Sequence, residues 1–152
     1  MSQVKYDFSK KNVLLVGGTT GIGRATALAF AQAGANLYVA GLGAEHGESL
    51  GEEITALGVE YVFEEVDVRD PKAMKAMHKA AFERYGRIEF AFNNAGVSGK
   101  TAPLQELEDE DYNLQMDVNL RGMFHGLREQ IPHMVKHGGG AIVNTSSLFG
   151  VM

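Results

Sequence analysis

The chain lacks several features that would otherwise narrow its chemistry or its location. It has no cysteine, which excludes a disulfide framework, a thiolate zinc site and a cysteine nucleophile, and agrees with a reducing compartment. No apolar run follows a basic head at the amino end, and no stretch approaches the ~20 apolar residues of a membrane span. We therefore expect a cytoplasmic protein that is neither exported nor inserted into a membrane.

Positive charge is also scarce. Lysine and arginine number 14 against 19 aspartate and glutamate residues, which gives a formal net charge of −5 at pH 7. An acidic chain is poorly suited to a partner that is bound by neutralising phosphates, so we expect no nucleic-acid partner. What is present, 45% hydrophobic and 22% charged residues in a length of 152, is typical of one folded domain. Glycine is in excess, at 19 residues.

Apolar runs of strand length alternate with segments of helical period along the whole chain. The expected strands are 12–16, 37–40, 61–66, 88–92 and 141–145, and the expected helices are 22–33, 45–57, one opened by Asp70-Pro71, and about 109–136. Strands joined by helices run parallel with right-handed crossovers. The pattern therefore predicts an open, doubly wound α/β sheet.

A glycine-rich loop lies between the first strand and the first helix. Its sequence is Gly17-Gly18-Thr19-Thr20-Gly21-Ile22-Gly23, and backbone N–H groups at such a junction form an anion site that a pyrophosphate can approach closely. A phosphate-loop nucleotidase would need Lys and then Ser or Thr after the loop, where this chain has Arg24 and Ala25. A glycine-rich turn without a ligand is the other alternative, which three glycines at one junction disfavour.

With these motifs the chain resembles the short-chain dehydrogenases/reductases from Asn12 to Gly150. The glycines at 17, 21 and 23 match the family's T-G-x-x-x-G-x-G pattern, with Val16 in place of Thr. The other matching segments are the adenine-binding dipeptide Asp67-Val68, the N-N-A-G motif Asn93–Gly96, the long-helix signature Val118-Asn119-Leu120, and the fifth strand with its serine, Ile142–Ser147.

The resemblance implies a Rossmann-type, three-layer αβα sheet of strand order 3-2-1-4-5, with NAD or NADP lying across the switch between the first and fourth strands. It implies hydride transfer between the nicotinamide and a small alcohol or carbonyl substrate, and a homo-oligomer for the full-length protein. Ser147 and Asn119 take the catalytic positions. The cofactor positions are Gly17, Gly18, Thr19, Thr20, Gly21, Ile22, Gly23, Leu42, Asp67, Val68, Asn94, Ala95, Gly96 and Val118.

The choice between NAD and NADP is not marked in the sequence. An acidic residue at the end of the second strand favours NAD through the ribose 2′-hydroxyl, and a basic one favours the 2′-phosphate of NADP. This chain has Gly41-Leu42-Gly43 there, so both cofactors stay open.

The family's catalytic Tyr and Lys, spaced Tyr-x-x-x-Lys, would follow Ser147, where only residues 148–152 remain. We therefore expect a domain, 1–152, that is truncated at its carboxyl end and does not turn over. Tyr6 and Lys10 have the right spacing but precede the first strand, and we treat this as coincidence. Part of the long helix's apolar stripe, from Tyr112 to Ile131, is then expected to be exposed. The alternative is a non-catalytic dinucleotide-binding or interaction protein.

Two other patterns are set aside. His133 and His137 have the spacing of a metal pair on a helix, but the sequence places no third ligand beside them, and cations are favourable near a helix carboxyl end. The segment 109–113 opens like a calcium loop, yet Leu114 and Leu120 occupy the positions of its required Gly and Glu. We assign no metal site.

Overall fold

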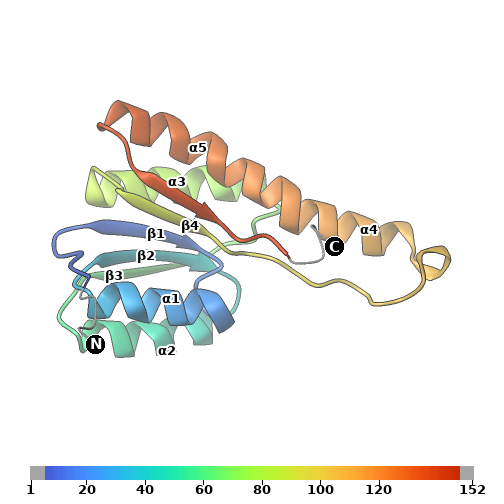
Figure 1. Ribbon diagram of the computed structural model, residues 1–152, viewed down its shortest axis with the longest axis horizontal. Helices are drawn as coiled ribbons and strands as arrows, with labels where there is room; N and C mark the ends of the chain where they lie inside the picture. Colours follow the sequence, from blue (N-terminus) through green and yellow to red (C-terminus); the bar gives the residue numbers. More distant parts are fainter. Residues whose placement is uncertain (1–5, 148–152) are drawn as a thin grey trace, which may run out of the picture.

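A five-stranded parallel sheet forms the centre of the molecule, a computed structural model that describes residues 6–147. Its order is β3-β2-β1-β4-β5 (Figure 1), as predicted. The strands are β1 (Asn12–Val16), β2 (Asn36–Gly41), β3 (Tyr61–Glu65), β4 (Phe90–Asn93) and β5 (Ala141–Asn144). Each predicted strand boundary lies within two residues of the observed one.

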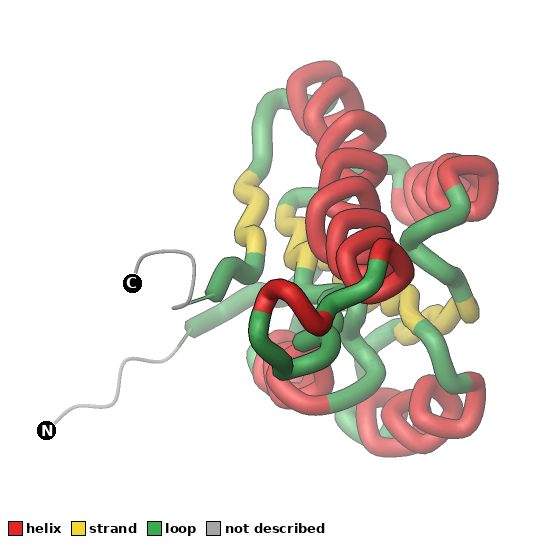
Figure 2. Tube along the Cα trace, turned by 90° about the vertical axis from the view of Figure 1, so that its right-hand side faces the viewer, coloured by secondary structure: helices red, strands yellow, loops and turns green. Residues whose placement is uncertain are grey.

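Helices cover both faces of the sheet. The helices α1 (Gly21–Gln32) and α2 (Ala44–Thr55) lie on one face, and α3 (Pro71–Tyr85) and α5 (Met123–Lys136) lie on the other (Figure 1). Figure 2, turned by 90°, shows the strands between these two helical layers. After β3 the chain crosses to β4 on the other side of β1, so the loops that leave the paired carboxyl ends of β1 and β4 run to helices on opposite faces of the sheet. Open α/β sheets bind their ligands at this position.

The helix predicted for about 109–136 is interrupted. It consists of α4 (Asp109–Gln115), a π-helical segment η2 (Met116–Gly122) and α5, preceded by a short 3₁₀ helix η1 (Leu104–Glu106). Within η2, the Asn119 amide bonds both backbone groups of Val97, at 2.8 and 2.9 Å. A π turn shifts the helix phase by adding a residue, and such turns are frequent at functional sites.

The core is built on β1 and β2, whose successive side chains point to opposite faces. Leu14 and Tyr38 pack toward α3, whereas Leu15 and Val39 pack toward α1 and α2. All four are buried. Strands covered on both faces by helices read as continuous apolar runs, which explains the sequence of β1.

The apolar stripe of the long helix largely faces away from the core, as expected. Tyr112, Leu120 and Phe124 are 61%, 59% and 55% exposed. The buried face that packs toward α3 and the sheet instead carries Val118, Gly122, His125, Gly126, Gln130 and Met134. An exposed stripe of this kind favours association between molecules.

We predict that the chain self-associates through this stripe. The double substitution Phe124→Glu and Ile131→Glu should shift sedimentation-velocity profiles toward monomer, because it places charge on an exposed apolar surface. Leu57→Glu, at an exposed leucine after α2, is the matched control and should leave the profile unchanged. A wild-type chain that sediments only as monomer would contradict the prediction.

Two histidines are packed between α3 and α5. His78 is fully buried, its Nδ1 lies 2.7 Å from the carbonyl oxygen of Met74, and its Nε2 lies 3.2 Å from Nε2 of Gln130. The His133 ring stacks on Phe82 with centroids 3.7 Å apart. Burial lowers the pKa of His78, and burial together with His137 and Lys136 lowers the pKa of His133.

Stability should therefore fall in acid. A histidine whose folded-state pKa is depressed binds its proton more readily in the unfolded chain, so stability is fully present above about pH 6.5 and declines below it. Each histidine contributes a slope of up to about 1.4 kcal/mol per pH unit. Urea unfolding followed by circular dichroism between pH 8 and pH 5 measures this slope.

His78→Gln removes one of the two titrating groups and should flatten the slope below pH 6.5. Above that pH, the variant and wild type should differ by a constant offset only. Identical slopes in the two proteins below pH 6.5 would show that His78 does not carry the effect.

Candidate cofactor and active site

The loop between β1 and α1 has a conformation that depends on glycine. Gly17 has φ +81°, and a Cβ on it would lie 2.3 Å from the backbone nitrogen of Ala95, two residues after β4. A Cβ on Gly23 would lie 2.0 Å from the carbonyl oxygen of Gly17. The first turn of α1 can therefore lie directly against the loop, and the loop against β4, only without side chains.

The amino end of α1 faces this loop. Thr20, at the N-cap position, has extended backbone angles and makes no side-chain bond to the first turn, and that turn of the described chain contains no acidic residue. Gly21 has φ +51°, and a Cβ there would meet nothing within 4 Å. Backbone N–H groups at a helix amino end, left without a capping side chain, are suited to bind an anion such as a pyrophosphate.

A cleft of about 310 Å³ extends from the loop across the carboxyl ends of the strands. Its lining includes many of the predicted cofactor residues: Gly17, Thr19, Thr20, Leu42, Asp67, Val68, Asn94, Ala95, Gly96 and Val118. The Thr19 hydroxyl donates to the carbonyl oxygen of Leu42 at 3.2 Å, which joins the loop to the end of β2.

One ion pair lies in the lining of this cleft. The Arg69 Nε is 3.0 and 2.9 Å from the two carboxylate oxygens of Asp67, and Nη2 is 2.6 Å from Oδ2. These hydrogen bonds hold the pKa of Asp67 below its usual value. Asp67 is therefore ionised at neutral pH and faces the cleft with its charge balanced by Arg69.

A second cleft, of about 750 Å³, shares Thr20 and residues 94–97 with the first. Its lining contains Gly21, Ile22 and both predicted catalytic residues, Asn119 and Ser147. Of the other predicted cofactor residues, Gly18 lies in the loop, where a Cβ on it would meet Val39 at 2.7 Å, and Gly23 lies in the first turn of α1. The structure thus gathers residues from four distant parts of the sequence at one edge of the sheet. Gly150, where the resemblance to the family ends, lies outside the described residues.

A buried network of amides supports this edge from below. Asn93 Nδ2 donates to the side-chain oxygens of Gln130 and Asn144, each at 2.9 Å, and Gln130 donates back to Asn93 Oδ1 at 2.8 Å. Next to it, Asn94 donates to the carbonyl oxygen of Gly17 at 3.0 Å and accepts from the Thr145 hydroxyl at 2.8 Å. Gln130 and Thr145 are absent from the predicted site residues. The signal that could have marked Gln130 is its place as a polar residue on the core-facing side of α5.

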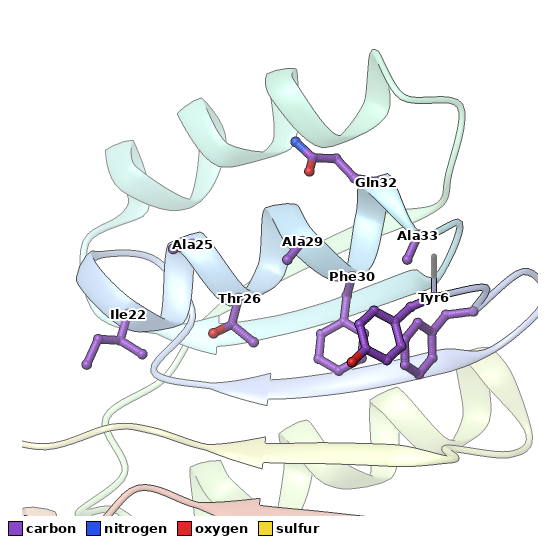
Figure 3. Close-up of a pocket in the computed structure, with 9 residues that line it drawn as sticks. Tyr6, Ile22, Ala25, Thr26, Ala29, Phe30, Gln32 and Ala33 are labelled. Carbon is purple, nitrogen blue, oxygen red and sulfur yellow. The ribbon is translucent and has the colours of Figure 1, made fainter. Parts of the chain in front are cut away.

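A largely apolar hollow lies elsewhere. A groove of about 720 Å³ follows α1 between Ile22 and Phe30 and reaches Tyr6 and Phe8 (Figure 3). Its lining comprises mostly apolar side chains and lacks the converging polar groups that fix the orientation of a small ligand. The clefts at the glycine loop are therefore the better candidate site.

Comparison with known proteins identifies the family of the chain. A family model described as short chain dehydrogenase matches residues 11–152. The chain belongs to the short-chain dehydrogenase family. Cyclohexanol dehydrogenase of Acinetobacter sp. (strain SE19) is 36% identical over 145 residues, which are 95% of this chain and 58% of that protein. The 3beta-hydroxysteroid dehydrogenase of Mediterraneibacter gnavus is 37% identical over 144 residues, 95% of this chain and 52% of that one.

Solved structures of short-chain dehydrogenases superpose closely on the chain. Levodione reductase has a TM-score of 0.92 at 35% identity, over 95% of this chain and 57% of its own. NAD+-bound xylitol dehydrogenase has a TM-score of 0.92 at 33% identity, over 95% and 55%. The chain thus spans little more than half the length of these family members.

The described residues offer neither a membrane span nor a cluster of metal ligands. No helix within residues 6–147 is long and apolar enough to cross a bilayer. In the same part of the chain, no three His, Asp or Glu side chains gather as metal ligands would.

The close contact between Gly23 and Gly17 should make the free energy of unfolding sensitive to a side chain at position 23. Gly23→Ala should lower the free energy of unfolding by about 3 kcal/mol, at the upper end of overpacking costs, because its Cβ meets a backbone oxygen that cannot rotate away. Gly21→Ala, with open space around its Cβ, should cost only the roughly 1–2 kcal/mol of left-handed backbone. Urea unfolding compares them; equal losses would contradict the packing argument.

Proposed function

We propose that this chain is the nucleotide-binding part of an NAD(P)-dependent oxidoreductase, which transfers a hydride between the nicotinamide and an alcohol or carbonyl substrate. The observation that carries the proposal is the glycine-rich loop, whose close contacts exclude side chains at Gly17 and Gly23 and which opens into a cleft continuous with Asn119 and Ser147. The names of its relatives support it, since they include dehydrogenases and reductases, and one of the similar structures is NAD+-bound.

The residues present fit a dinucleotide. Leu42, Asp67 and Val68 would hold the adenosine, and the backbone of residues 17–23 would hold the pyrophosphate. Asn94, Ala95 and Gly96 would lie along the nicotinamide half, beside Asn119 and Ser147. When bound, the nicotinamide supplies or accepts the hydride.

Two polar residues of the chain are proposed to act on the substrate side. Ser147 would bind the substrate oxygen, and Asn119 would support proton movement while its amide holds the backbone of Val97 in place. The 152 residues contain no Tyr-x-x-x-Lys after Ser147. A general acid/base contributes about 10²–10⁴ in rate, so we propose that these residues bind the cofactor without useful turnover.

Isothermal titration of the chain with NAD+ and NADP+ tests the proposal. We expect saturable binding of at least one nucleotide, and no change in absorbance at 340 nm when cyclohexanol is added. Failure of both nucleotides to bind would refute cofactor binding by this chain. Turnover comparable to that of a complete dehydrogenase would refute the proposed inactivity.

Nucleotide binding by two variants at Gly21 tests whether the pyrophosphate lies at the amino end of α1. Asp and Asn both tolerate a positive φ, and the space around a Cβ at this position is open. Gly21→Asp places a negative charge in the anion site and should weaken nucleotide binding about tenfold more than the isosteric, neutral Gly21→Asn, a difference of ~1.4 kcal/mol. Equal affinities in the two variants would place the pyrophosphate elsewhere.

A further inference from the structure

We infer that Glu65 supplies the acidic group beside the adenosine ribose that the end of β2 lacks, and that it thereby selects NAD over NADP. The inference rests on the proposed function and assigns a specificity role to a residue of β3. In the sequence this position carries no signal, because the acidic residue that binds a ribose is expected at the end of the second strand.

The end of β2 faces the glycine loop but carries no charge. A Cβ on Gly41 would lie 3.3 Å from the Thr19 hydroxyl and 3.7 Å from Cα of Gly17. The next residue, Leu42, is 61% exposed at the rim of the cleft. Any side chain that recognises the ribose must therefore come from a neighbouring element.

Glu65 is the neighbour in register. It pairs with Gly41 in the parallel ladder, so its side chain leaves the sheet on the face toward which a side chain at 41 would point. Its Oε1 accepts a hydrogen bond of 2.9 Å from the backbone N–H of Gly43, in the turn between β2 and α2. This bond brings the carboxylate over the end of β2. Within residues 6–147 its Oε2 has no hydrogen-bond partner, so this oxygen can accept from a hydroxyl.

The cations nearby are already paired. Arg69, the cation among the residues that line the cleft, holds Asp67 with both Nε and Nη2. Arg24 forms an ion pair with Glu53. In the first turn of α2, Glu45 adds a further acid, 3.9 Å from His46. A ribose 2′-hydroxyl can donate to Glu65, whereas a 2′-phosphate would bring negative charge against it.

Competing titrations of the whole chain with NAD+ and NADP+ at low ionic strength test the role of Glu65. The wild type should bind NAD+ at least tenfold more tightly than NADP+. Glu65→Gln keeps the shape of the side chain and an acceptor for Gly43, and should reduce this preference at least fivefold, mainly by strengthening NADP+ binding. Added salt should reduce the wild-type preference and affect the variant less, because screening acts on the charge.

Glu64→Gln is the matched control. Glu64 precedes Glu65 in the same strand but accepts from the Tyr38 hydroxyl on the opposite face of the sheet. The preference of the Glu64→Gln variant for NAD+ over NADP+ should stay within twofold of the wild-type value. Equal binding of both nucleotides by the wild type, or equal preferences in Glu65→Gln and wild type, would overturn the inference while leaving cofactor binding intact. Binding of neither nucleotide by the wild type would overturn the proposed function together with the inference.

Discussion

The close approach of two backbones is the constraint on which the rest of the site depends. The loop after β1 packs against the segment that follows β4, and a side chain at Gly17 would not fit between them. The first turn of α1 packs against the same loop at Gly23. These contacts place the amino end of α1 beside the paired carboxyl ends of β1 and β4. A dinucleotide can be held there largely by main-chain N–H groups, whose positions do not depend on side-chain rotamers.

The amide network behind the site connects β4 to the helical layer formed by α3 and α5. Asn93 is the last residue of β4 and forms a hydrogen bond with Gln130 of α5, which in turn contacts His78 of α3. Because all three side chains are buried, an unpaired polar group among them would be costly, and the network admits few alternative arrangements. The position of α5, and with it Asn119 at its amino side, is therefore tied to the strand that carries Asn94.

Much of the fold could be predicted from the sequence, because a parallel sheet buried on both faces produces continuous apolar runs at β1 and β2 and helical periods between them. The glycine loop could be predicted because its chemistry requires consecutive residues. The π-helical segment could not, since apolar residues keep a spacing of four from Tyr112 to Phe124 and so predict an uninterrupted helix. Nor could the role proposed for Glu65, because strand register brings together positions 41 and 65, which are distant in the sequence.

The strand order also has a consequence for how the chain acquires its structure. The central strand β1 is completed by β4, and the contact between Asn12 and Glu89 closes a separation of 77 residues. At a synthesis rate of ~5–20 residues per second, β1 emerges from the ribosome about 4–15 seconds before its partner. During that interval one edge of an apolar strand has no neighbour on its own chain. Until β4 is synthesised, the unpaired edge of β1, beside which the cofactor site later forms, can therefore pair with other nascent chains.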